Sequence, residues 1–285
     1  MDSDRRSFIL GGSAMLFAAG CNQQPPQADA TRENPYDWAK PLDNLDAFVK
    51  VIGDTAGHPA WLSAQGRIYA MRPNEMPVPI LAIEGLRHVQ FKAIESGYRW
   101  SLRDWAFYRD INTGEVLDQF SNPFTGAINE TRHILTGYYS WTLGPNGQDV
   151  PGFGGKAWWI DRPFILPWTQ DRDYVTVPME LLVQYESGAS GGEWMHLTAK
   201  TGDLFNPDLT SAPMTHAWTG DSAWVRWMEM GDTPGRTLWQ STGQKHRSIE
   251  TLRPELRSAI DRYFPGSIED PAGYERTSYT VSPAN

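Results

Sequence analysis

Short runs of β-branched and aromatic residues, separated by turn residues, fill most of this chain. Between residues 67 and 243, about a dozen such runs alternate with turns such as 112–114 and 122–126. Branched and aromatic side chains pack well on pleated strands, whereas Gly, Asn and Pro supply tight turns. No long helical pattern alternates with the runs. The sequence therefore predicts an all-β fold (with minor α), built on an antiparallel β-barrel or barrel-like sheet.

Two helical patterns flank the predicted sheet, one N-terminal and one C-terminal. In 36–57, the apolar residues that share one helix face are Leu45, Phe48, Val49 and Ile52, and Asp43 or Asn44 is the expected N-cap. In 254–264, Pro254 suits a first helical position, and Leu256 and Ile260 share an apolar face. Because no repeat or linker interrupts the region between these patterns, we expect 36–285 to be a single β-rich domain.

The first twenty residues have the features of an export signal. Arg5 and Arg6 precede the uncharged apolar segment 8–19, which is too short to span a bilayer, since a transmembrane helix needs about 20 residues. Cys21 follows directly and is the only cysteine. The pattern resembles a twin-arginine (Tat) signal peptide over 1–20 followed by a lipoprotein cleavage site. Cleavage without lipidation and a plain signal peptide are the alternatives.

This signal predicts where the protein goes and which partners it meets. We expect the Tat export machinery to deliver it to the periplasm, where a lipid on Cys21 anchors it to a membrane through the flexible tether 21–35. The Tat route carries folded proteins, which permits a cofactor without implying one, so the cofactor stays unknown. The formal net charge of −9 and the lack of a basic run argue against nucleic acid as a partner.

Thirteen tryptophans are the largest departure from ordinary composition. Each indole buries about 150–250 Å² and needs a partner for its N–H group. They fit either an aromatic-filled core or a cavity for a small apolar or aromatic ligand. The run 223–230 is predicted to be a strand that is apolar on both faces, which favours a cavity. The candidate ligand-binding residues are Trp100, Arg103, Trp105, Trp194, Trp224, Arg226 and Trp227.

Candidate catalytic residues are fewer. Of the six histidines, His88 and His133 fall in predicted strands and can both face a cavity. Glu180 has mainly apolar neighbours along its predicted strand, so burial would suit it to proton transfer. No pairwise spacing of histidines supports a metal site, so we predict none, and three histidines meeting from separate strands is a less favoured alternative.

Two groups of motifs resemble a known family. The first lies in 97–126 and includes Tyr108, Asp110, the string TGEVL at 113–117 and NPFTG at 122–126. The second lies in 227–235 (WMEMGDTPG) and continues with Gly243, Lys245 and the helix 252–264. Together they resemble the bacterial family with domain of unknown function 1838, over about 48–271. The resemblance implies a compact, barrel-like antiparallel domain that is often exported, and it carries no activity over to this chain.

These observations lead to three hypotheses about function. The leading one is an exported, lipid-anchored protein that binds a small apolar or aromatic molecule in a Trp-rich interior. The second is a periplasmic lyase, isomerase or hydrolase that uses His88, His133 and Glu180 on such a compound. The third is an envelope interaction protein whose exposed aromatic residues bind a partner.

Overall fold

The computed structural model describes residues 32–149, 162–184 and 190–274, so the predicted signal and Cys21 lie outside the described residues. The helices are α1 (Pro41–Ile52), α2 (Thr201–Leu204) and α3 (Pro254–Tyr263), with 3-10 turns η1 (Arg226–Met228) and η2 (Ile249–Thr251). The strands are β1 (Ala60–Met71), β2 (Val78–Ile94), β3 (Gly97–Arg109), β4 (Gln119–Ser121), β5 (Ile128–Glu130), β6 (Ile134–Leu135), β7 (Tyr139–Gly144), β8 (Gly147–Asp149), β9 (Thr169–Asp171), β10 (Tyr174–Gln184), β11 (Ser190–Lys200), β12 (Met214–Ser222) and β13 (Arg236–His246).

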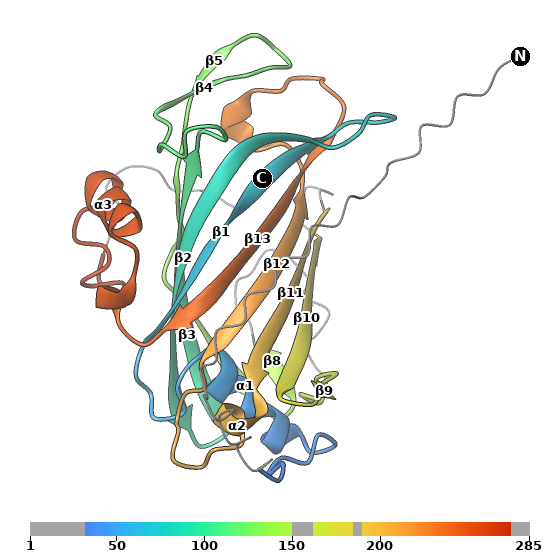
Figure 1. Cartoon of the computed structure of the whole chain (residues 1–285), viewed down its shortest axis with the longest axis vertical. Helices are drawn as coiled ribbons and strands as arrows, with labels where there is room; N and C mark the ends of the chain where they lie inside the picture. The colour runs from blue at the N-terminus through green and yellow to red at the C-terminus, as the bar shows by residue number, and fades with distance from the viewer. Residues whose placement is uncertain (1–31, 150–161, 185–189, 275–285) are drawn as a thin grey trace, which may run out of the picture. The chain divides into compact units, whose positions relative to one another are not determined.

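One antiparallel sheet of 11 strands forms the body, in the order β8-β7-β3-β2-β1-β13-β12-β11-β10-β9, with β6 beside β3 (Figure 1). Strands β4 and β5 make a separate hairpin. This confirms the predicted antiparallel, mainly β fold. Within the described residues the end strands β8 and β9 do not pair with each other, so the sheet is not closed into a barrel.

The sheet curls around an inner face. Asp104 of β3 and Leu181 of β10 line one cavity, although five strands separate β3 from β10 in the order. Strand register assigns the other residues to faces: Leu62 of β1 lies opposite Arg87 of β2 and Lys245 of β13, so all three share the inner face. Helix α3 packs on the outer face, where it contacts β2 and β3 residues (Figure 1).

Two apolar clusters fill the ends of the inner space. At one end α1 inserts Phe48 against Phe91 of β2 and Trp100 of β3. At the other end, Trp227 of η1 packs against Tyr108 of β3, with ring centroids 4.9 Å apart. Since large side chains occupy both ends, an open space between them has to lie near the middle of the strands.

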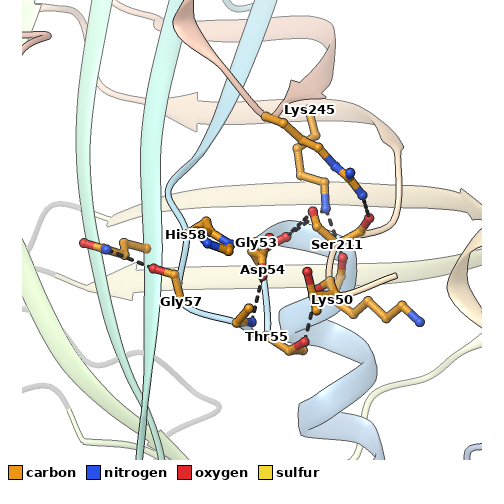
Figure 2. A network of polar contacts seen from close by, with 12 residues as sticks. Lys50, Gly53, Asp54, Thr55, Gly57, His58, Ser211 and Lys245 are labelled. Atoms are coloured by element: carbon orange, nitrogen blue, oxygen red, sulfur yellow. Dashed lines mark hydrogen bonds and ion pairs between the residues drawn. The ribbon is translucent and has the colours of Figure 1, made fainter. Parts of the chain in front are cut away.

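Polar contacts fix the C-terminal end of α1 to the sheet (Figure 2). Lys245 donates from Nζ to the carbonyl oxygens of Lys50 and Gly53, at 2.9 and 3.0 Å. Ser211 Oγ also donates to the Gly53 carbonyl, and the Ala212 amide donates to that of Lys50. These donors satisfy carbonyls that a helix end leaves without intrahelical partners.

Two local predictions are wrong. The run 223–230 is not a strand: its centre forms the turn η1, and left-handed backbone at Glu229 and Gly231 (φ 49° and 53°) folds it into the end of the inner space. The strand lies earlier, as β12. The N-cap of α1 is Lys40, since Pro41 takes the first helical position, while Asn44 is buried and accepts a hydrogen bond from the Leu166 amide.

Candidate binding cavity inside the curved sheet

Small residues leave a cavity of about 340 Å³ in the middle of the inner face. Ala64 of β1 and Gly85 of β2 line it, and Ala64 lies between Gly85 and Gly243 of β13, so that the three share the inner face. Ala106 of β3 and Gly220 of β12 continue the lining. Protein interiors are otherwise close-packed. The cavity therefore follows from side-chain size: small residues hold central inner positions on β1, β2 and β3, whereas large residues fill the ends.

Two tryptophans form an aromatic wall. Trp218 of β12 and Trp239 of β13 line the cavity, with ring centroids 6.3 Å apart in an edge-to-face arrangement. The Trp218 ring lies across Gly220, where an added Cβ would stand 2.7 Å from the ring. Its Nε1 donates to Glu193 Oε2 of β11 at 3.1 Å. The missing side chain at Gly220 thus lets the indole lie flat and point its N–H group at a carboxylate.

An ion pair lies in the opposite wall. Arg87 of β2 donates from Nε to Asp104 Oδ1 of β3 at 2.5 Å and from Nη2 to Oδ2 at 3.3 Å. The side chains are 27% and 24% exposed. Burial by itself lowers the pKa of the Arg87 guanidinium, but the charge and hydrogen bond of Asp104 and the charge of Glu193 together raise it above its usual value. Arg87 therefore stays charged and is bound to Asp104 at two points.

His216 of β12 lines the cavity as a neutral ring. Its side chain is 8% exposed, and burial lowers its pKa to about 4. Nε2 lies 3.1 Å from the Ser63 carbonyl oxygen, which can only accept, so Nε2 carries the proton. Within the described residues, Nδ1 is buried without a hydrogen-bond partner. His216 therefore adds a polar group, and no charge, to the wall at pH 7.

The predicted ligand-binding residues do not form one site. Of that set only Trp105 lines the cavity, and its Nε1 donates to Ser267 on the outer side at 2.8 Å. Trp100 is packed in the α1 cluster, and Trp227 closes the other end. The remaining members are dispersed, and their places are as follows: Arg103 donates to the Tyr274 carbonyl, Trp224 donates to the Thr233 carbonyl, and Trp194 and Arg226 are exposed.

The predicted catalytic residues are also apart from the cavity. His88 lies on the outer face against Trp61, with ring centroids 4.9 Å apart, and burial together with the Arg103 charge lowers its pKa to about 4. His133 is buried beside Tyr263 of α3, with ring centroids 4.3 Å apart, and its Nδ1 accepts a hydrogen bond from the Tyr108 amide. The expected burial of Glu180 is wrong, because this side chain is exposed on the outer face. Their catalytic roles stay predictions, without a shared site.

One cavity residue that sequence reasoning missed, Arg87, carries a signal in the sequence. Ile83, Gly85, Arg87, Val89 and Phe91 alternate along one face of β2, and Arg87 is the charged residue among them. A charge on an otherwise apolar face indicates a buried partner. That signal points to Arg87, but the identity of its partner depends on the pairing of β2 with β3.

In the described ranges, no three His, Cys, Asp or Glu side chains come together as metal ligands. None of the helices in those ranges is long and apolar enough to cross a membrane.

The match to known proteins covers the part of the chain that builds the cavity. A sequence model of a family described as protein of unknown function (DUF1838) matches residues 57–282. This range contains every strand of the large sheet and helix α3, and it begins after α1. No curated protein matches the chain.

Proposed function

The chain belongs to the DUF1838 family of proteins of unknown function, and we propose that it binds a small, mainly apolar or aromatic molecule inside the curved sheet. The observation that carries this proposal is the cavity of about 340 Å³ on the inner face, bounded by Trp218 and Trp239. Small-molecule sites typically measure about 300–1,000 Å³, with apolar walls and a few polar groups. The walls supply apolar contact, and the Arg87–Asp104 pair with Glu193 supplies polar groups that orient a guest.

A cavity-filling variant tests this proposal. Ala64→Leu adds three carbon atoms at the point where Gly85 and Gly243 face Ala64 from both sides. We expect 4-phenylbutan-1-ol to change the tryptophan fluorescence of the unaltered protein saturably, because Trp218 and Trp239 line the cavity. In Ala64→Leu the affinity should fall about tenfold or more, since the probe loses the volume it occupies.

The matched control is Ala93→Leu, the same substitution at an exposed position of β2 away from the cavity. It should bind the probe as the unaltered protein does. Equal affinities of Ala64→Leu and the unaltered protein would place the probe elsewhere, and a panel of phenylalkanols that all fail to bind saturably would refute the cavity function.

Catalysis in the same cavity is the second candidate function. The observation favouring it is that Asp104, Glu193 and the neutral His216 line one cavity, so groups able to move a proton face the same guest. In this version the enzyme is a lyase, isomerase or hydrolase that uses these residues in place of His88, His133 and Glu180. Mass spectrometry of ligands incubated with the protein tests it: turnover should stop in Glu193→Gln.

We propose that the protein is exported and anchored through Cys21, in keeping with Arg5 and Arg6 before an apolar segment. In cells, Cys21→Ala should move the protein from the membrane fraction to the soluble periplasmic fraction. Replacing Arg5 and Arg6 by Lys should keep it in the cytoplasm. If Cys21→Ala left the protein in the membrane fraction, the proposed lipid anchor would be wrong. If the protein with Arg5 and Arg6 replaced by Lys still reached the periplasm, the proposed twin-arginine export would be wrong.

A further inference from the structure

Among the described residues that line the cavity, carboxylates outnumber cations. The titratable ones in this described lining are Arg87, Asp104, Glu193, His216 and Asp221. The guanidinium of Arg87 is held at two points by Asp104. Asp221 accepts from Arg236 at 2.5 Å at the rim, and His216 is neutral. After this pairing, the charge left in the described cavity wall is the single negative charge of Glu193.

Within the described residues, the side-chain hydrogen bond that Glu193 makes comes from a neutral donor, because its Oε2 accepts from Trp218 Nε1. None of the ion pairs in those residues includes Glu193. The Arg87 charge also acts on Glu193 from β2, but both side-chain hydrogen bonds that Arg87 donates go to Asp104, whose negative charge balances it. Glu193 is half-buried, and within the described residues its Oε1 accepts no hydrogen bond, so a group that enters the cavity can reach this oxygen.

We propose that the ligand is an amine: an apolar or aromatic body that carries a positively charged nitrogen, which binds Glu193. This inference rests on the proposed function of the same cavity. The ammonium donates to Glu193 in a charge-assisted hydrogen bond and lies near the indoles of Trp218 and Trp239, whose ring faces attract cations. A carboxylate ligand would add a second unpaired negative charge to the same wall, so the cavity selects against it.

Three probes with the same body and different head groups test the charge of the ligand. 4-Phenylbutylamine, 4-phenylbutan-1-ol and 4-phenylbutanoate carry +1, 0 and −1 charges at pH 7. Each is titrated into the full-length protein by calorimetry at one ionic strength. We expect the amine to bind about tenfold or more tighter than the alcohol, and the carboxylate to bind weakest. In Glu193→Gln the advantage of the amine over the alcohol should disappear.

Glu130→Gln is the matched control, because it removes an exposed carboxylate of β5, away from the cavity. It should keep the amine preference. Glu193→Asp retains the negative charge and should keep part of the preference for the amine. The order of the three probes on the unaltered protein decides the inference even where a variant does not fold, which circular dichroism reports.

The outcomes separate the two proposals. Equal binding of amine and alcohol, or tighter binding of the carboxylate, overturns the amine inference and leaves cavity binding intact. An amine preference that persists in a folded Glu193→Gln overturns the role of Glu193. If none of the probes binds saturably, both the amine inference and the proposed function fail.

Discussion

Lys245 places an ammonium group inside the fold, against the C-terminal end of α1 (Figure 2). A cation suits this position, because the carbonyl end of a helix is negative. Burial nevertheless lowers its pKa from 10.5 to about 7, and the nearby Arg247 charge acts in the same direction. The helix end thus contacts a lysine whose charge changes near neutral pH.

This lysine should make stability rise with pH. Between about pH 7 and 10.5 the unfolded chain binds a proton at position 245 that the folded chain does not, so the free energy of unfolding increases across that window and is lowest below it. We expect Lys245→Met to raise the free energy of unfolding at pH 6 by about 2 kcal/mol and to flatten the rise. Urea titrations between pH 6 and 9.5 measure both effects.

The Lys50 and Gly53 carbonyls keep donors in this variant, because the Ala212 amide and Ser211 Oγ still reach them. Lys50, whose pKa burial also lowers, leaves some residual slope. The control is Lys92→Met, at an exposed position of β2, which should keep the slope of the unaltered protein. A free energy of unfolding that is flat with pH in the unaltered protein would contradict the argument.

At the scale of elements, α3 shows how an amphipathic helix completes the outer face. Leu256 and Ile260 are fully buried against Trp61, Leu86 and Trp105 of three neighbouring strands. Arg257 points to solvent from the other side of the helix. The helix covers sheet residues that would otherwise expose large aromatic surfaces.

We expect Ile260→Ala to lower the free energy of unfolding by about 2–4 kcal/mol, because it removes buried methyl groups and leaves a cavity. Arg257→Ala on the exposed side should change it by less than about 0.5 kcal/mol. Chemical denaturation of both variants is the measurement. Similar small losses in the two would mean that α3 does not pack on the sheet as the structure has it.

The same elements show what a sequence can predict. The apolar face of α3 follows from its spacing alone, because helix periodicity fixes which residues share a face. The run 223–230 misleads because apolar composition suits a strand and an end cluster equally, and the left-handed turn at Glu229 is a property of the folded backbone. Arg87 and Asp104 meet through the register of the β2–β3 hairpin, which its two-residue turn fixes. Asp104 and Leu181 face one cavity only because the sheet curls across five intervening strands, and no local pattern contains that curvature.

At the scale of the described body, the close approach of β1 and β13 shapes the cavity. An added Cβ at Gly243 would stand 1.8 Å from the Ser63 carbonyl oxygen and 2.5 Å from His216 Nε2. Backbone atoms on β1 cannot yield without opening the β1–β13 ladder. Gly243 therefore permits the close approach of β1 and β13 and the position of His216 in the cavity wall, which gives the motif at Gly243 and Lys245 a structural reason.

Gly243→Ala should damage stability and binding together. We expect a loss of about 3 kcal/mol or more in the free energy of unfolding, since the methyl group meets backbone and a buried ring. Probe binding should weaken as well, because β1 and β13 both line the cavity.

Gly202→Ala is the control: nothing lies within 4 Å of its added Cβ, and Ala in α2 should leave stability unchanged or raise it slightly. Thermal unfolding with and without 4-phenylbutan-1-ol measures both quantities, and a Gly243→Ala protein as stable as Gly202→Ala would show that the two strands do not approach so closely.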